Sequence, residues 1–183
     1  MKRSRLLLSK LPQLIIMAAI AAFITIRAQT PPAVSQDDHE YKEISIITLS
    51  QVQKLYPSAV SFIYNEQADK LSEVFDMEGT LIGYFIATTP YADDVRGYGG
   101  AVPLLIGIDA GGKIAGVSFL PNAESGGFVK IITAEGVLDS WNGLAVDEAL
   151  EKEVDAVSGA TMTSTAVIES FKKRLFFFVS KQQ

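Results

Sequence analysis

Hydroxyl side chains gather at one point of this 183-residue sequence, in the segment Asp155-Ala156-Val157-Ser158-Gly159-Ala160-Thr161 and the Met162-Thr163-Ser164 that follows it. The apolar spacing beyond this point predicts a helix, at whose entry unpaired N–H groups and the positive dipole end favour an anion. Gly159 and Ala160 carry little side-chain bulk, so a large group could approach the backbone. These residues suit a hydroxyl that carries a phosphate ester, but hydroxyl residues before a helix usually act only as N-caps.

The residues from Asp155 to Thr161 resemble the flavinylation motif Asp-x-x-Ser/Thr-Gly-Ala-Thr of the FMN-binding domain family. That family is found in the G subunit of Rnf-type electron transport complexes and the C subunit of sodium-translocating NADH:quinone reductases. The resemblance implies that a Mg²⁺-dependent flavin transferase joins FMN, through its phosphate, to Thr161, which makes the chain a covalent flavoprotein and a phosphoprotein. It further implies that Asp155 and Ser158 serve recognition by the transferase or local hydrogen bonding. Ser158 also belongs to the implied cofactor-binding segment, with Gly159, Ala160 and Thr163.

Two other segments resemble the same family. Together with the motif, they extend the resemblance over about Val95 to Phe171. Gly97-Tyr98-Gly99-Gly100 is similar to a Gly-Tyr-x-Gly segment that precedes a strand, and it implies that Tyr98 contacts the flavin. The alternative is a glycine loop that only permits tight turns.

The second segment is Asn122-Ala123-Glu124-Ser125-Gly126-Gly127-Phe128, where the family has His-x-Glu-Thr-Pro-Gly-Leu-Gly against the isoalloxazine ring. The resemblance implies that Glu124, Ser125 and Gly126 lie beside the flavin. Asn122 replaces the histidine and Gly126 replaces the proline, which predicts a more flexible loop on the ring side.

The composition excludes several kinds of redox, metal and catalytic site. The chain has no cysteine, which excludes disulfides, cysteine-ligated iron–sulfur clusters and c-type haem attachment. Its single histidine, His39, leaves no material for a histidine metal site or a Ser-His-Asp triad, so we assign no catalytic and no metal-binding residue. Redox chemistry in this chain would require an organic cofactor.

Charge separates the N-terminus from the rest of the chain. Five of the 16 basic residues precede the first acidic residue, Asp37, which leaves 11 basic against 21 acidic residues in the remainder. So acidic a domain would repel a phosphate backbone, and nucleic acid is excluded as a favoured partner.

The N-terminal residues are typical of an export segment. Residues 1–28 combine a basic start with an apolar run from Leu14 to Ile26, and 29–43 form a polar linker with Pro31-Pro32. As a helix the apolar run spans about 20 Å, short of the roughly 30 Å of a bilayer core. A cleaved signal peptide and a retained membrane anchor both stay open, and both place the folded part, 44–183, in the periplasm or on the outer face of the cytoplasmic membrane.

The periodicity of the remainder predicts a single compact α+β domain with a mostly antiparallel sheet and packed helices, because its strands come in adjacent pairs. The expected helices are Leu49–Tyr56, Ala134–Trp141, Val146–Glu151 and about Ser164–Val179, and the expected strands are Leu71–Asp76, Leu81–Thr88, Leu104–Ile108 and Ile114–Phe119.

The terminal helix carries an apolar stripe of Val167, Phe171, Leu175 and Phe178. Basic residues 172–174 toward its end are expected to complement the helix dipole. The run Phe176-Phe177-Phe178 either packs in the core or forms a surface for a partner or a membrane, with the core favoured. Trp141 either packs in the core or stacks on the flavin, and the core is again favoured.

These features together predict an extracytoplasmic electron-transfer flavoprotein, a subunit or partner of membrane redox subunits, with covalent FMN on Thr161. Two alternatives stay open. The first is an exported, cofactor-free binding or scaffold module in which Thr161 is only a helix cap. The second is an enzyme that passes electrons from its flavin to a small acceptor.

Overall fold

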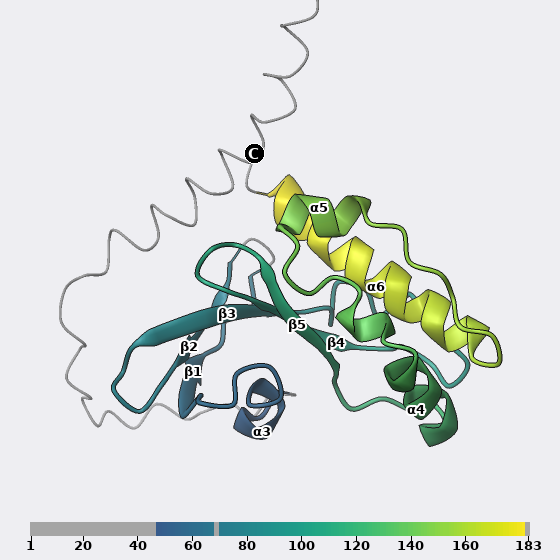
Figure 1. Cartoon of the computed structure of the whole chain (residues 1–183), viewed down its shortest axis with the longest axis horizontal. Helices are drawn as coiled ribbons and strands as arrows, with labels where there is room; N and C mark the ends of the chain where they lie inside the picture. The colour runs from purple at the N-terminus through teal and green to yellow at the C-terminus, as the bar shows by residue number, and fades with distance from the viewer. Residues whose placement is uncertain (1–46, 68–69, 182–183) are drawn as a thin grey trace, which may run out of the picture.

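The computed structural model describes residues 47–67 and 70–181, which form one antiparallel sheet with helices on both faces (Figure 1). The strands form a meander in the order β1-β2-β3-β4-β5. They are β1 (Ser61–Ile63), β2 (Ser72–Phe75), β3 (Leu81–Ala87), β4 (Leu104–Ile108) and β5 (Ile114–Phe119). This confirms the predicted α+β class with an antiparallel sheet. Residues 1–46, with the expected signal or anchor, the linker and the domain start at 44, lie outside the described residues.

The helices follow the sheet, apart from a first short one. They are α3 (Leu49–Val52), α4 (Gly126–Ala134), the 3₁₀ helix η1 (Val137–Asp139), α5 (Val146–Glu151) and α6 (Thr161–Ser180). Among the described residues no helix has the length and hydropathy needed to cross a bilayer.

Two hairpins share one turn chemistry, which explains why both were predictable. Asp76 Oδ1 accepts hydrogen bonds from the N–H groups of Glu78 and Thr80, and Asp109 Oδ1 does the same for Gly111 and Lys113. In each turn the fourth residue is a glycine with positive φ, Gly79 and Gly112. Glycine adopts this conformation at no steric cost, so an Asp-x-x-Gly sequence fixes the turn and the strand register.

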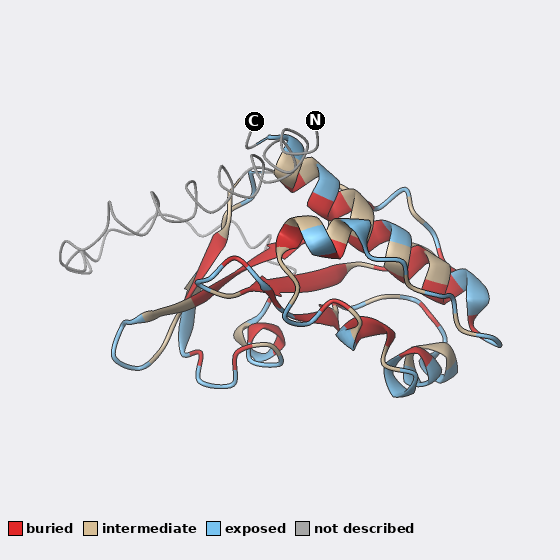
Figure 2. Ribbon diagram, turned by 45° about the horizontal axis from the view of Figure 1, so that its top comes forward, coloured by how far each residue is buried: buried red, intermediate tan, exposed pale blue. Residues whose placement is uncertain are grey.

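The sheet buries both of its faces, because alternate residues of β3 and β4 point to opposite sides. Tyr84, Ile86 and Ile106 face the core under α4, α5 and α6, while Phe85 and Leu105 face a second cluster under α3. Figure 2 shows the buried stripe of α6 turned toward the sheet and its exposed residues turned away.

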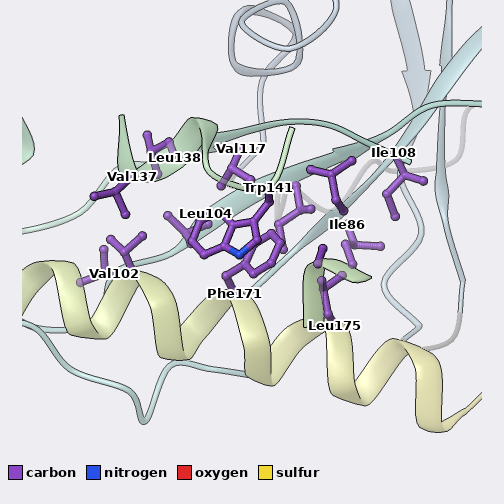
Figure 3. Close-up of a cluster of buried hydrophobic side chains, with 14 of the residues drawn as sticks. Ile86, Val102, Leu104, Ile108, Val117, Val137, Leu138, Trp141, Phe171 and Leu175 are labelled. Carbon is purple, nitrogen blue, oxygen red and sulfur yellow. The ribbon is translucent and has the colours of Figure 1, made fainter. Parts of the chain in front are cut away.

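The long helix α6 is held by its predicted stripe. Val167, Phe171 and Leu175 are fully buried, and Trp141 stacks on Phe171 with ring centroids 3.9 Å apart (Figure 3). Trp141 is therefore a core residue, as favoured from the sequence. In the Phe176-Phe177-Phe178 run, Phe178 is 2% exposed and packs in the core, as favoured from the sequence, whereas Phe176 is 61% exposed.

On the opposite face Tyr56 locks α3 to the sheet. Its hydroxyl lies 2.7 Å from the carbonyl oxygen of Tyr84 and 2.9 Å from that of Ile108. The ring lies so close to β3 that a Cβ on Gly83 would come within 2.5 Å of it. Burial raises the pKa of the Tyr56 hydroxyl.

Several predicted elements differ from the structure. The helix expected over Ala134–Trp141 is wrong: α4 ends at Ala134, because Gly136 adopts a left-handed conformation with φ 70°, and only η1 follows. Helix α4 itself was missed, since it opens on Gly126-Gly127 and glycine disfavours helix interiors. Strand β1 was also missed, and α6 begins at Thr161, ahead of the expected Ser164.

The expected dipole role of residues 172–174 is wrong, because α6 continues to Ser180 and its last turn contains no basic residue. Arg174 is instead buried, and its Nε donates to the carbonyl oxygen of Ala87 at 2.7 Å. Lys172 and Lys173 form ion pairs with Glu153 and Asp94.

Phe178→Ala should lower the free energy of unfolding by about 3 kcal/mol, since it removes a buried aromatic ring from the core. Phe176→Ala is the matched control on the same helix and should change it by less than about 0.5 kcal/mol. Urea denaturation of the three proteins measures both effects. Equal losses for the two variants would contradict the assigned orientation of α6.

Candidate functional site

The loop before α6 is built around a left-handed glycine. Gly159 has φ 82°, and a Cβ there would meet nothing within 4 Å. The backbone conformation therefore requires a glycine here, and the space around it is open. The turn it makes is closed by a hydrogen bond from the Ala160 N–H to the Val157 carbonyl oxygen at 3.1 Å.

Ser164 ties this loop to the helix. Its fully buried hydroxyl accepts a hydrogen bond from the Val157 N–H at 2.9 Å and lies 2.9 Å from the Ala160 carbonyl oxygen, to which it donates. One buried side chain thus satisfies a donor and an acceptor of the loop backbone, which fixes the loop against the first turn of α6.

Thr161 is the first residue of α6, and it is exposed. The N-cap is Ala160, and Thr161 Oγ1 donates to the Val157 carbonyl oxygen at 3.2 Å. A cap would accept from a backbone N–H. The interpretation of Thr161 as a helix cap is therefore wrong, and the cofactor-free alternative loses the role it gave to this residue.

The three hydroxyls of the first turn differ in access. Thr163 is 1% exposed and Ser164 is fully buried, and both are hydrogen-bonded, whereas Thr161 faces solvent. Helical geometry causes this, because Thr163 and Ser164 continue the buried stripe of α6 and Thr161 lies off it. Of these three hydroxyls, Thr161 is the one that a large group can reach.

Glu124 brings the other predicted segments to this point. Glu124 is 9% exposed. Its Oε1 accepts a hydrogen bond from the Gly99 N–H at 2.6 Å, and its Oε2 accepts one from the Thr163 hydroxyl. A single carboxylate therefore joins the 97–100 loop, the segment before α4 and the first turn of α6.

Asn122 shapes the segment that carries Glu124. Its amide nitrogen donates to the Leu120 carbonyl oxygen at 2.9 Å, and its amide oxygen accepts from the Glu124 N–H at 3.0 Å. Both polar atoms of this side chain are used within the loop. The residue that stands where the family has histidine therefore holds the loop backbone in shape.

Ser125 and Gly126 start α4. Ser125 is the N-cap and accepts from the Gly127 N–H at 3.4 Å, and Gly126 is the first helical residue. Proline is favoured at this helix position, because its missing N–H would have no partner inside the helix.

Tyr98 is 70% exposed, and its ring packs edge-on against Phe128 with centroids 5.5 Å apart. Next to it, Gly99 allows a close approach of two backbones: a Cβ there would lie 2.2 Å from the Ala123 carbonyl oxygen. The glycines of this loop therefore do more than permit a turn.

The structure brings Glu124 and Thr163 into contact. Thr161 lies two residues before Thr163, and Tyr98 directly precedes Gly99, which also bonds Glu124. It leaves Asp155 and Ser158 exposed, and neither side chain makes a hydrogen bond with any described residue. The expected local hydrogen bonding is thus not found within the described part of the chain, and recognition by a transferase stays a prediction. Sequence reasoning missed Gly99 and Ser164 as structural contacts, since their partners are groups that no spacing reveals.

Comparison with known proteins shows which family this part of the chain is similar to. Residues 97–175 match the FMN-binding domain family. This part of the chain therefore resembles an FMN-binding domain. The matched part begins at the 97–100 loop and ends in α6, so it contains all three segments that Glu124 joins.

Relatives of this domain are G subunits of redox complexes. Over 115 residues the chain is 32% identical to the G subunit of the Na⁺-translocating ferredoxin:NAD⁺ oxidoreductase complex of Acetobacterium woodii, an alignment that covers 56% of this chain and 53% of the relative. The G subunit of the proton-translocating ferredoxin:NAD⁺ oxidoreductase complex of Clostridium ljungdahlii is 30% identical over 43% of this chain and 46% of its own. The G subunit of the ion-translocating oxidoreductase complex of Aliivibrio fischeri is 26% identical, over 48% and 47%. The chain spans about half the length of these relatives.

The residues at the site fit FMN. The first turn of α6 has no side-chain cap and no acidic residue, so its N–H groups and dipole favour a phosphate. Exposed Tyr98 and Met162 offer apolar surface of the kind on which a flat ring packs. Among the described residues no group of three or more His, Cys, Asp or Glu could hold a metal ion.

Gly99→Ala should lower the free energy of unfolding by about 1–3 kcal/mol, because the new Cβ would overlap the Ala123 carbonyl oxygen and force two backbones apart. Gly127→Ala is the control, since its Cβ would meet only Ser125 Oγ at 3.6 Å, and it should be neutral or stabilising by up to about 1 kcal/mol. Chemical denaturation measures both. A neutral Gly99→Ala would refute the close approach.

Gly126→Pro should raise the free energy of unfolding by about 0.4–1 kcal/mol, because proline restricts the unfolded chain at a compatible position. A Cβ at Gly126 meets nothing within 4 Å, and Ser125 already has the extended conformation that precedes proline, with φ −59° and ψ 128°. Val129→Pro is the contrast within the same helix: it removes the hydrogen bond from the Val129 N–H to the Ser125 carbonyl oxygen and should cost about 3 kcal/mol. A melting temperature that falls for Gly126→Pro would contradict the assigned start of α4.

Proposed function

We propose that this chain is an extracytoplasmic electron carrier whose FMN is bound covalently, through its phosphate, to Thr161 Oγ1. The observation that carries the proposal is the access of the Thr161 hydroxyl, beside two buried hydroxyls, in the part of the chain that matches the FMN-binding domain family. Thr161 is also the residue that the resemblance to the flavinylation motif implies for attachment. FMN would supply the redox chemistry, accepting and donating electrons one or two at a time.

The chain's own residues would attach and orient the group. Thr161 releases its hydrogen bond to the Val157 carbonyl oxygen when its oxygen is esterified, and the Ser164 contacts keep the loop in place without that bond. A phosphodiester at this position keeps one negative charge next to the helix N-terminus, where it is stabilised. Tyr98 and Glu124 lie on the neighbouring segments.

The coupling needs an activated donor. A bond forms between Thr161 Oγ1 and the flavin phosphorus, the hydroxyl proton leaves, and the phosphoanhydride bond of an activated flavin nucleotide breaks so that its other half departs. A flavin transferase would supply this donor and the Mg²⁺. Exposed Asp155 and Ser158 suit recognition by such an enzyme, since their side chains make no hydrogen bond with the described part of the domain.

Covalent attachment accords with a location outside the cytoplasm. Occupancy of a reversible site depends on the free ligand concentration over the dissociation constant. Where free FMN is scarce, a micromolar site, worth about −8 kcal/mol, would empty, and an ester bond removes this dependence. The basic and apolar residues 1–28, which lie outside the described residues, support export or anchoring. Membrane redox subunits are the proposed partners, since the relatives are subunits of ion-translocating oxidoreductase complexes.

Thr161→Ala should abolish covalent flavin while the domain stays folded. The test is co-expression with a flavin transferase, denaturation, and detection of flavin fluorescence at the position of the polypeptide in a gel. Because Thr161 is exposed and does not cap the helix, the variant should lose less than about 0.5 kcal/mol of stability.

Thr133→Ala is the matched control. Thr133 is also exposed, and its hydroxyl also donates to the carbonyl oxygen four residues earlier, that of Val129, at 2.8 Å. This variant should keep the fluorescent band at full intensity. A band that persists in Thr161→Ala would refute the attachment.

A further inference from the structure

Among the described residues, Glu124 is the one whose side chain forms hydrogen bonds with both the 97–100 loop and α6. Its two oxygens are divided between them, Oε1 to the Gly99 N–H and Oε2 to the Thr163 hydroxyl. In Figure 1, α4 and the N-terminal end of α6 lie at the same end of the molecule, with Glu124 just ahead of α4.

The arrangement is tight around this side chain. A Cβ on Gly97 would come within 2.7 Å of Glu124 Oε1, and one on Gly99 would strike the Ala123 carbonyl oxygen. A buried carboxylate is costly unless hydrogen bonds satisfy it, so the two donors and the carboxylate depend on one another. The position of the 97–100 loop is therefore coupled to the position of the first turn of α6.

Each end of this contact lies beside a residue of the proposed flavin site. Thr163 stands two positions after Thr161 on the same helical turn, and Gly99 directly follows the exposed Tyr98. Fixing Thr163 and Gly99 on one carboxylate fixes the attachment oxygen relative to the exposed aromatic side chain.

We propose that Glu124 is a positioning residue for the flavin: by holding the Gly99 N–H and the Thr163 hydroxyl, it sets the place of the Tyr98 loop against the group carried by Thr161. This inference rests on the proposed function. Attachment itself does not require Glu124, since the Thr161 hydroxyl bonds the Val157 carbonyl oxygen and not this carboxylate. What Glu124 provides is one defined environment for the attached ring.

A positioning role differs from a purely stabilising role in what it changes. A residue that only stabilises the fold would lower the melting temperature and leave the flavin environment of the folded protein as it was. A positioning residue alters the signals that report how the ring is held, which are the visible-region circular dichroism and the fluorescence anisotropy of the attached flavin.

The test compares flavinylated Glu124→Gln and Thr163→Val with the wild-type protein. Gln keeps the shape of the side chain and removes its charge, and Val keeps the shape of threonine and removes the donor. Both variants should keep the covalent fluorescent band and lose most of the visible circular dichroism, with lower anisotropy. The flavin signals of the double variant should equal those of the single ones. Gln lacks the second acceptor oxygen and Val lacks the donor, so each change removes the same hydrogen bond between these two side chains.

Tyr56→Phe is the control for lost stability. It removes a buried hydroxyl on the opposite face of the sheet, away from this contact, and should lower the melting temperature without changing the flavin signals. Unchanged flavin signals in Glu124→Gln, or equal changes in Tyr56→Phe, would overturn the proposal, and if Glu124→Gln does not fold, Thr163→Val decides. An unlabelled wild-type protein would instead refute the proposed function, and this inference with it.

Discussion

Burial of one face of α6 is the constraint on which the site depends. The helix packs its stripe on the sheet, and the stripe runs from Thr163 and Ser164 through Phe171 to Phe178. Since successive residues turn by a fixed angle, burying Thr163 and Ser164 leaves Thr161 outside. The exposed hydroxyl is thus a consequence of core packing about Trp141 and Phe171, many residues away along the chain.

The two buried hydroxyls gain separate roles from the same burial. Ser164 satisfies the backbone of the loop that delivers Thr161, and Thr163 satisfies the carboxylate that gathers the neighbouring segments. Buried polar groups need hydrogen-bond partners. Ser164 has its partners in the loop just ahead of the helix, and Thr163 has its partner in Glu124, which is distant in sequence. The first turn of α6 is therefore both a structural junction and the place where the chain presents an alcohol to solvent.

Local signals explain what could be predicted from the sequence. The Asp-x-x-Gly turns at Asp76 and Asp109 carry their own side-chain acceptor and positive-φ glycine, and the apolar spacing of α6 names its buried face. The elements that failed are those decided by tertiary contacts. Helix α4 opens on two glycines and is held by the packing of Ile132 and Phe128 on the core, and β1 has three residues that depend on pairing with β2.

The same division applies to the candidate site. The motif from Asp155 to Thr161 indicated the alcohol that the structure exposes. The sequence around Glu124 did not reveal that its carboxylate would bond Thr163. Nor did it reveal that Asn122 would use both polar atoms of its amide within its own loop. Arg174 was interpreted as a cation near the helix end and is a buried donor to the Ala87 carbonyl oxygen. Contacts between residues far apart in the chain produce no spacing pattern in the sequence, so they could not be predicted from it.

The central claim is that one alcohol oxygen carries the flavin, and the most direct measurement is the intact mass of the protein isolated from its native host, followed by fragmentation of the peptide that contains residues 155–164. We predict the mass of the polypeptide plus one FMN less one water, with the whole addition on Thr161. The unmodified mass, from cells that contain the transferase, or an addition on Thr163 or Ser164, would contradict it.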